Sequence, residues 1–227
     1  MGKRVVVLSL GGSLIVPEVI DLKFLRNFRE VIKKNTKNCK FVIVCGGGSV
    51  ARKYINALKE EGKSEYLQSL TGIAITRVNA RFMSYFFGQD PEFGIPHDMK
   101  QIKNLLLRND IVFCGALRYA ANQTSDATAC KLAAFLKSDF INLTNVKGLY
   151  DKNPKFKDAK FIPTITREAF AKIVNAIPNK PGMHAPVDHV AMKEILLHKI
   201  KVYILGNNAK QIDNLLNNKP FIGTTID

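Results

Sequence analysis

The chain has 227 residues, of which 46% are hydrophobic, 9% aromatic and 23% charged, and these ordinary values exclude disordered, collagen-like and low-complexity proteins. The net charge of +15 attracts polyanions, but the basic residues are spread along the chain without a nucleic-acid-binding motif, so phosphorylated metabolites are the expected partners and nucleic acid is the weaker alternative. No apolar run is long enough to cross a membrane or to form a secretory signal, so we expect a cytoplasmic protein with no membrane partner.

Short apolar runs that end at glycine or at a polar turn recur along the chain. They are predicted strands, and they cover residues 4–10, 41–45, 111–114, 140–143 and 201–205. Such continuous runs are expected of strands in a parallel sheet whose two faces are both buried. Because helical patterns lie between them, the sequence predicts a single α/β domain over residues 1–227. Its expected architecture is a three-layer αβα sandwich with a mostly parallel central sheet.

The spacing of apolar residues between these runs predicts amphipathic helices. Their apolar faces extend from Leu22 to Ile32, Val50 to Leu58, Ile102 to Leu106, Ala127 to Ala134 and Val190 to Leu196. Asp98 and Asp188 are placed to cap two of these helices. Residues 88–97 and 175–186 are rich in glycine, proline and asparagine, so both are predicted loops, and the second is a candidate lid.

Two glycine-rich loops follow the first two predicted strands, namely Gly11-Gly12-Ser13 and Gly46-Gly47-Gly48-Ser49. Neither matches the P-loop or the dinucleotide-binding fingerprint. Each loop alone fits a tight turn, but two at one sheet edge, each before a helix, favour phosphate binding, because free N–H groups and the helix dipole attract anions. Arg52 follows the second loop and lies within reach of such a phosphate.

Two further groups of residues leave a structural and a functional interpretation open. Thr124-Ser125-Asp126 fits a helix cap, and equally a carboxylate that organises phosphoryl transfer. Arg77 and Arg81 lie four residues apart and share a helix face that is either solvated or functional. Cys39, Cys45, Cys114 and Cys130 have neither metal-ligand nor disulfide-framework spacing, so no metal site is assigned.

Several motifs occur together in the order and spacing of a known family. They occupy residues 7–14 (VLSLGGSL), 44–52 (VCGGGSVAR), 72–77 (GIAITR), 124–127 (TSDA), 144–150 (TNVKGLY) and 223–225 (GTT). On these residues the whole chain resembles the amino acid kinase family, and within it the archaeal uridylate kinase branch. The resemblance implies an αβα sandwich assembled as a homohexamer, ATP and UMP as substrates, and transfer of the γ-phosphate of ATP to UMP with Mg²⁺.

The resemblance also implies roles for individual residues. Those at the ATP phosphates are Gly12, Ser13, Gly48 and Arg52, and those at the nucleoside end of ATP are Thr144, Asn145, Tyr150 and Asn153. Those at UMP are Gly47, Ser69, Arg118, Thr124 and Asp126, and the catalytic set is Asp126, Arg52 and Asp188. Acceptor-binding features thus fall mainly in the N-terminal part and ATP-binding features in residues 140–227. Mg²⁺ would arrive with ATP, without dedicated protein ligands.

The chain departs from the family pattern at several positions. Ser9 stands where many members carry a lysine that bridges phosphates, although archaeal uridylate kinases often lack it, and Ser69 replaces an aspartate that holds the UMP ribose. Lys147 and Asn153 replace acidic residues of the nucleotide loop, and the acceptor loop over residues 116–123 is longer than usual. These departures leave two alternatives open: a kinase of the same fold for a different small anion, and a non-catalytic nucleotide-binding or storage module.

Overall fold

Seven strands form the central sheet of the protein, whose computed structural model describes residues 2–92, 94–119, 124–176 and 187–227. Their order across the sheet is β3 (Ile111–Cys114), β2 (Cys39–Cys45), β1 (Arg4–Leu10), β4 (Asp139–Leu143), β8 (Val202–Leu205), β9 (Thr224–Ile226) and β7 (Thr164–Ile165). The first five are parallel, and β9 runs antiparallel to β8. The predicted, mostly parallel sheet is therefore confirmed, and all five predicted strands lie in it.

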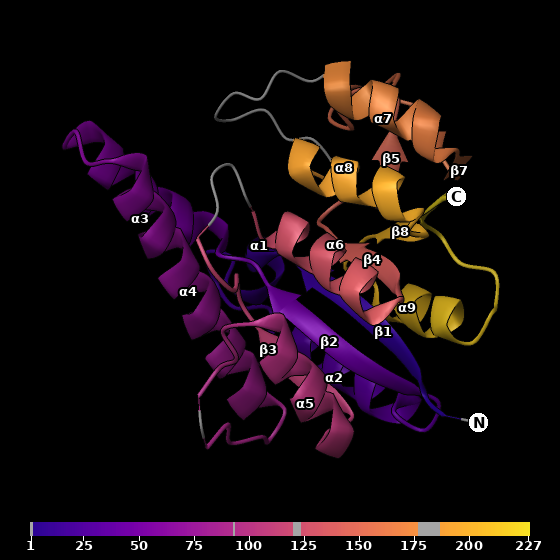
Figure 1. Cartoon of the computed structure of the whole chain (residues 1–227). Coiled ribbons are helices and arrows are strands. Elements are labelled where there is room, and N and C mark those ends of the chain that lie inside the picture. Colours follow the sequence, from indigo (N-terminus) through magenta and orange to yellow (C-terminus); the bar gives the residue numbers. More distant parts are fainter. Residues whose placement is uncertain (1, 93, 120–123, 177–186) are drawn as a thin grey trace.

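Helices cover both faces of this sheet, which gives the expected three layers (Figure 1). One face carries α5 (Met99–Arg108), α6 (Ser125–Leu136) and α8 (His189–His198), with α7 (Arg167–Ala176) outside α8. The other face carries α2 (Leu22–Asn35) and α9 (Ala209–Leu216), which pack against each other. The strand residues between the layers, such as Val7, Leu8 and Val42, have no exposed surface, as expected of a sheet covered on both sides.

The helix α2 illustrates how the sequence pattern produces the packing. Its N-cap is Asp21, whose carboxylate accepts a hydrogen bond from the Phe24 amide at 2.9 Å. Leu25, Phe28 and Ile32 are completely buried one turn apart. Leu22, although part of the predicted apolar face, remains 46% exposed, so the buried stripe is narrower than predicted.

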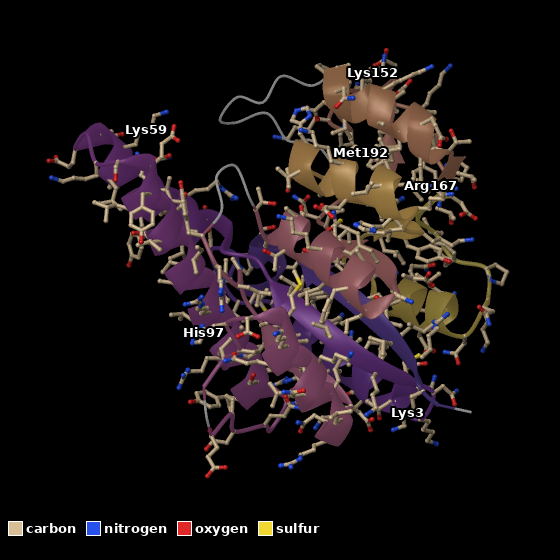
Figure 2. All side chains as sticks on the ribbon, viewed as in Figure 1. Lys3, Lys59, His97, Lys152, Arg167 and Met192 are labelled. Atoms are coloured by element: carbon tan, nitrogen blue, oxygen red, sulfur yellow. The ribbon has the colours of Figure 1, made fainter. Side chains whose placement is uncertain are left out.

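The helix α6 packs closely against the sheet because its inner face consists of small residues. Ala127, Cys130 and Ala133 are fully buried, as predicted from their spacing. On the outer side α6 contacts α8, where Met192, labelled in Figure 2, is also buried. The helix α8 begins after its predicted N-cap, Asp188, as α5 does after Asp98.

The pair α3 (Gly48–Glu60) and α4 (Glu65–Phe86) departs from the expected packing. The two helices lie side by side, and α3 projects away from the sheet with the start of α4, so that Lys59 lies near the outer end of α3 (Figures 1 and 2). The later half of α4 packs on β2 and β3. The predicted apolar face from Val50 to Leu58 is only partly buried, since Val50, Ile55 and Leu58 are half-buried and Tyr54 is 53% exposed. The reason is that α3 packs on α4 and the short α1 (Gly12–Ile15) rather than on the sheet.

A two-stranded hairpin, β5 (Leu149–Tyr150) and β6 (Phe161–Ile162), lies outside the main sheet. The buried hydroxyl of Thr224 in β9 accepts a hydrogen bond from the Leu149 amide at 2.8 Å and donates one to the Ile162 carbonyl at 2.6 Å. This side chain therefore fixes the hairpin to the edge of the main sheet.

The two predicted loops lie partly within the described residues. The described residues of 88–97 are irregular, as predicted. The second predicted loop begins later than expected, because Asn175 still belongs to α7, and the rest of that segment, the candidate lid, lies outside the described residues. Among the described helices, none combines the length and apolar character needed to cross a membrane.

Candidate active site

The carboxyl ends of β1, β2, β3, β4 and β8 lie along one edge of the sheet because these strands are parallel, and we call this edge the carboxyl edge. From β1 the chain first builds outward through β2 to β3, then returns to the other side of β1 to form β4 and β8. The strand order therefore reverses beside β1. In open α/β sheets, ligands bind at the carboxyl edge at such a reversal.

The two glycine loops after β1 and β2 touch each other at the carboxyl edge. A Cβ atom on Gly12 would lie 2.1 Å from the Gly48 amide nitrogen, and one on Gly46 would lie 2.7 Å from the Gly12 nitrogen. Gly48 has a φ of +64°, which glycine adopts without strain. The Gly46 amide also donates to the Leu10 carbonyl at 2.9 Å, which joins the loops directly. Backbone N–H groups of two helix starts are thus brought together without any side chain.

The second loop also rests on α4. A Cβ on Gly47 would lie 3.6 Å from the Thr76 methyl group and 3.8 Å from the Gly72 carbonyl. The buried Asn79 side chain donates to the Gly46 carbonyl at 2.7 Å. Gly72, Thr76 and Asn79 are spaced by four and three residues, so one face of α4 supports the loop. Our sequence analysis did not assign a role to Thr76 or Asn79, although this spacing of small and polar residues was the available signal.

The same face of α4 holds the start of the loop between β3 and α6. Thr76 Oγ1 accepts a hydrogen bond from the Ala116 amide at 2.9 Å. The Arg77 guanidinium donates to the Ala116 carbonyl at 3.3 Å and to the Leu117 carbonyl. Of the two interpretations left open for Arg77, the solvated one is therefore wrong, because this side chain binds backbone 39 residues away. Arg81, one turn later, contacts the Tyr85 hydroxyl at 3.4 Å.

Asp126 lies in the first turn of α6, directly beside β1. The Ser9 hydroxyl, 1% exposed, donates a hydrogen bond to Asp126 Oδ1 at 2.7 Å. Burial raises the pKa of Asp126 to about 6, the Ser9 hydrogen bond lowers it, and the carboxylate of Asp188 raises it further. At position 9, where many members of the resembled family carry a lysine, this chain has a hydroxyl that donates to the carboxylate directly.

Thr124 and Asp188 link the starts of α6 and α8. Thr124 Oγ1 accepts from the Asp126 amide at 3.1 Å and the Ala127 amide at 3.4 Å, and it donates to Asp188 Oδ2. Asp188 Oδ1 in turn accepts from the Val190 and Ala191 amides at 2.7 and 2.9 Å. Both residues are therefore helix caps, and Asp126 is held between them at the carboxyl edge.

The ends of β4 and β8 form a separate part of the carboxyl edge. The Thr144 amide donates to the Leu205 carbonyl at 2.9 Å, and a Cβ on Gly206 would lie 3.0 Å from the Val146 carbonyl. Tyr150 packs edge-on against Phe161 of the hairpin, with ring centroids 5.6 Å apart. Asn145 and Asn153, which precede and follow β5 in the sequence, have exposed side chains. The Asn153 Oδ1 atom accepts a hydrogen bond from the Lys155 amide at 3.0 Å.

The remaining candidate residues lie around the glycine loops. Ser13 is exposed on α1, and its amide nitrogen lies 3.0 Å from where a Cβ on Gly48 would stand. Arg52 is exposed and is the fifth residue of α3, one turn further into the helix than predicted, because α3 begins at Gly48. Ser69 is half-buried one turn before Gly72, on the same face of α4.

Arg118 belongs to the described part of the loop before α6, whereas residues 120–123 of the longer acceptor loop lie outside the described residues. Its guanidinium lies 3.7 Å from the Asp98 carboxylate at the start of α5 and is 78% exposed. The adjacent Tyr119 ring packs edge-on against Tyr66 of α4, 4.9 Å between centroids. These contacts join α4, the loop and α5.

The side chains at the carboxyl edge determine whether the protein itself could hold a metal ion. Over the described ranges, no three His, Cys, Asp or Glu side chains are grouped closely enough to hold a metal ion. Asp126 and Asp188 supply two carboxylates: the first accepts from the Ser9 hydroxyl, and the second accepts from the Thr124 hydroxyl and two backbone amides. Two carboxylates are too few ligands to enclose a cation, but they suit a cation that is also bound by the phosphates of a ligand.

Comparisons with known proteins identify the family of the chain. The sequence profile of the Amino acid kinase family matches residues 4–206. A uridylate kinase of Thermococcus kodakarensis is 34% identical over 203 residues, which are 88% of this chain and 89% of that protein. The crystal structure of uridylate kinase from Archaeoglobus fulgidus superposes with a TM-score of 0.83 at 32% identity, over 98% of this chain and 99% of the other. The UMP kinase of Ureaplasma parvum, at 20% identity and a TM-score of 0.82 over the whole of both chains, shares the fold.

Proposed function

Because the chain belongs to the amino acid kinase family, we propose that it transfers the γ-phosphoryl group of ATP to UMP, giving ADP and UDP. The observation that carries this proposal is the contact between the two glycine loops beside the Ser9–Asp126 pair. Backbone donors and a fixed charge at one sheet edge are what phosphoryl transfer requires, since it depends on positioning and charge stabilisation.

In the proposed reaction, the backbone amides of Gly12, Ser13 and Gly48 bind the ATP phosphates. Arg52 reaches the same phosphates from α3 and offsets the negative charge that develops on the transferred group. The charge of Asp126 repels both substrates unless cations lie between them, so this carboxylate determines where the cations gather. Asp188 acts through Thr124 by fixing the start of α6.

The acceptor is proposed to bind between the second glycine loop and α4. Gly47 exposes backbone to the UMP phosphate, and Ser69 faces the same side of α4 as Gly72. Thr124 contributes as the cap of α6, because its hydroxyl is already bonded to Asp188. Arg118 steadies the acceptor from the loop that Arg77 holds in place.

The nucleoside end of ATP is proposed to lie over the ends of β4 and β8, against Thr144, Asn145, Tyr150 and Asn153. Acceptor-binding residues thus belong mainly to the N-terminal part of one domain, and ATP-binding residues mainly to residues 140–227. Mg²⁺ bound to the ATP phosphates would supply charge neutralisation, held by those phosphates rather than by a protein cage. Since ATP and UMP are the proposed substrates, the cytoplasm is the proposed location.

The proposed assembly is a homo-oligomer, with a hexamer expected from the family resemblance. Its support is the apolar surface of the projecting helices, where Tyr54, Leu67, Leu70 and Val78 are 53%, 46%, 38% and 62% exposed. Sedimentation of the purified protein tests this, and a monomer at micromolar concentration contradicts it. Introducing Lys at Leu70 is expected to dissociate the assembly.

The deciding experiment measures ADP release from ATP and Mg²⁺ with UMP as acceptor, and Asp126→Asn as the matched control. UMP-dependent turnover that the control loses supports the proposal. A screen of CMP, dUMP and non-nucleotide anions accompanies it. A clear non-nucleotide substrate favours a kinase with another acceptor, for which Ser69 is the motivation. ATP binding without turnover for any acceptor favours a non-catalytic module.

A further inference from the structure

Ser9 occupies an unusual position for a polar residue. It lies in β1 between Leu8 and Leu10, which have no exposed surface, and it pairs in register with Val44 and Asn142 of the neighbouring strands. Buried hydroxyl groups in native proteins are hydrogen-bonded. This hydroxyl donates to the carboxylate of Asp126, 117 residues away in sequence, at a distance of 2.7 Å. A residue that only filled space at this position of β1 would not need a hydroxyl group.

The surroundings of Asp126 make this hydrogen bond consequential. Asp188 faces it from the start of α8, and Cys130 lies one turn along α6. The uncharged, buried side chains of Cys45 and Asn142 belong to β2 and β4, the strands on either side of β1. Burial raises the pKa of both thiols well above their usual range, so they stay neutral near pH 7. Ser9 is thus the side chain that favours the charged form of Asp126 against burial and against Asp188.

We propose that Ser9 is a positioning residue for phosphoryl transfer, whose hydroxyl orients the Asp126 carboxylate at the carboxyl edge. This inference rests on the proposed function for its kinetic consequence. The hydroxyl of Ser9 contributes no charge of its own. The positive charge opposite the phosphates therefore has to come from Arg52 and from the cation bound to ATP.

The kinetic test compares the pH dependence of kcat for the wild type, Ser9→Ala and Ser9→Thr between pH 5 and 9. In the wild type, activity should fall below about pH 6, as Asp126 becomes protonated. In Ser9→Ala the midpoint should move upward by about one pH unit, because a hydrogen bond to a charged group is lost. Activity should recover to within about threefold of the wild type at pH 9. Ser9→Thr keeps the hydroxyl and should restore the wild-type midpoint.

The matched control is Ser84→Ala, which removes another buried serine hydroxyl, one that donates to the Ala80 carbonyl at 3.0 Å. It should leave the midpoint unchanged, so a general effect of removing a buried hydroxyl is separated from an effect on Asp126. An unchanged midpoint in Ser9→Ala, or an equal loss of activity at every pH, overturns the proposal.

A second measurement does not depend on activity. Aspartate labelled with ¹³C at the carboxyl group reports the titration of Asp126 by NMR, with Asp126→Asn identifying the signal. The Asp126 midpoint should be higher in Ser9→Ala than in the wild type, and equal values overturn the positioning role. If no acceptor supports turnover, the proposed function fails while this titration still decides whether Ser9 controls Asp126.

Discussion

Two parts of the carboxyl edge present polar groups in different ways, one through backbone amides and the other through side chains. The glycine loops after β1 and β2 present backbone amides, held by backbone contacts between Gly12, Gly46 and Gly48. The helix starts at Thr124 and Asp188 instead present side chains, with Asp126 held by Ser9 from the sheet. Both parts attract or orient charge, but the first is built from permanent dipoles and the second from groups that titrate.

This difference indicates which part can be tuned. A backbone amide keeps its dipole at every pH, and its position changes only if the whole loop moves. A buried carboxylate changes with pH, with a neighbouring hydroxyl and with a second carboxylate nearby. We therefore expect substitutions in the glycine loops to act through geometry at all pH values, and substitutions among the polar side chains to act in a pH-dependent and graded way.

The largest effect is expected from Gly12→Ala. The new methyl group would lie 2.1 Å from the Gly48 nitrogen and 2.6 Å from the Gly47 carbonyl carbon, so the loops must separate. We expect kcat to fall by about a thousandfold at every pH, because several backbone amides would no longer point at the phosphates. The free energy of unfolding should fall by about 1–3 kcal/mol. Steady-state kinetics and urea unfolding measure the two losses.

The control for this prediction is Gly11→Ala, whose methyl group would lie 3.2 Å from the Leu143 carbonyl oxygen, a contact that a small shift relieves. It should cost much less of both activity and stability. If Gly12→Ala kept activity within tenfold of the wild type, the loops would not depend on their mutual contact.

The second largest effect is expected from Asp126→Asn, which should lower kcat by about a hundredfold and yet stabilise the fold. The native state holds the Asp126 proton up to about pH 6, whereas the unfolded chain releases it near 3.8. Stability therefore falls as pH rises between these values, and removing the charge should add about 3 kcal/mol at pH 8 and nothing near pH 3.

Thermal unfolding at pH 8 and pH 4 checks the sign of this effect. Asp21→Asn is the matched control, because it makes the same charge change at a remote helix cap that asparagine also fulfils. Equal stabilisation of the two variants at pH 8 would show that net charge, and not the burial of Asp126, causes the change.

A smaller effect is expected from Thr124→Val, which removes the cap of α6 and the bond to Asp188 while keeping the branched shape. Loss of a cap costs about 1–2 kcal/mol, and kcat should fall by about tenfold because Asp126 shares that first turn. Thr124→Ser retains the hydroxyl and should behave as the wild type. A Val variant with unaltered urea midpoint would contradict the capping role.

The smallest effect is expected from Ser69→Asp, which supplies the carboxylate of the family pattern on the α4 face near Gly47. A charged partner for the ribose hydroxyls should lower KM for UMP by about fivefold to tenfold with kcat unchanged. The gain should vanish with 2′,3′-dideoxy-UMP. Gln68→Glu adds the same charge one residue away and should have no such effect, so equal gains would assign the change to electrostatic attraction alone.

Much of the fold was predictable because its strands are continuously apolar. The five predicted strands, the caps Asp98 and Asp188 and the small-residue face of α6 depend on local spacing, and the structure has all of them. The meeting of the two glycine loops also follows from parallel strands with a common carboxyl edge. Local sequence patterns were sufficient wherever the relevant contact is within one element or between adjacent strands.

The contacts that sequence spacing could not reveal are those between distant side chains and backbone. Arg77 reaches Ala116 across 39 residues, and Thr224 reaches Leu149 across 75. Helical periodicity identified an apolar face on α3, but periodicity does not say what covers a face, and here α4 covers it only in part, leaving Tyr54 exposed. The hydrogen bond between Ser9 and Asp126 was likewise invisible, although both residues were singled out individually.

The close approach of Gly12 to Gly48 limits how the sequence of the two glycine loops can evolve. A side chain added to either glycine collides with the backbone of the other loop, so no single substitution leads from this phosphate-binding arrangement to a different working one. Ser69 and Arg118 carry no such mutual constraint and can vary one at a time. A lineage built on this fold is therefore expected to change its acceptor through small, separate steps, while its way of holding phosphate is inherited unchanged.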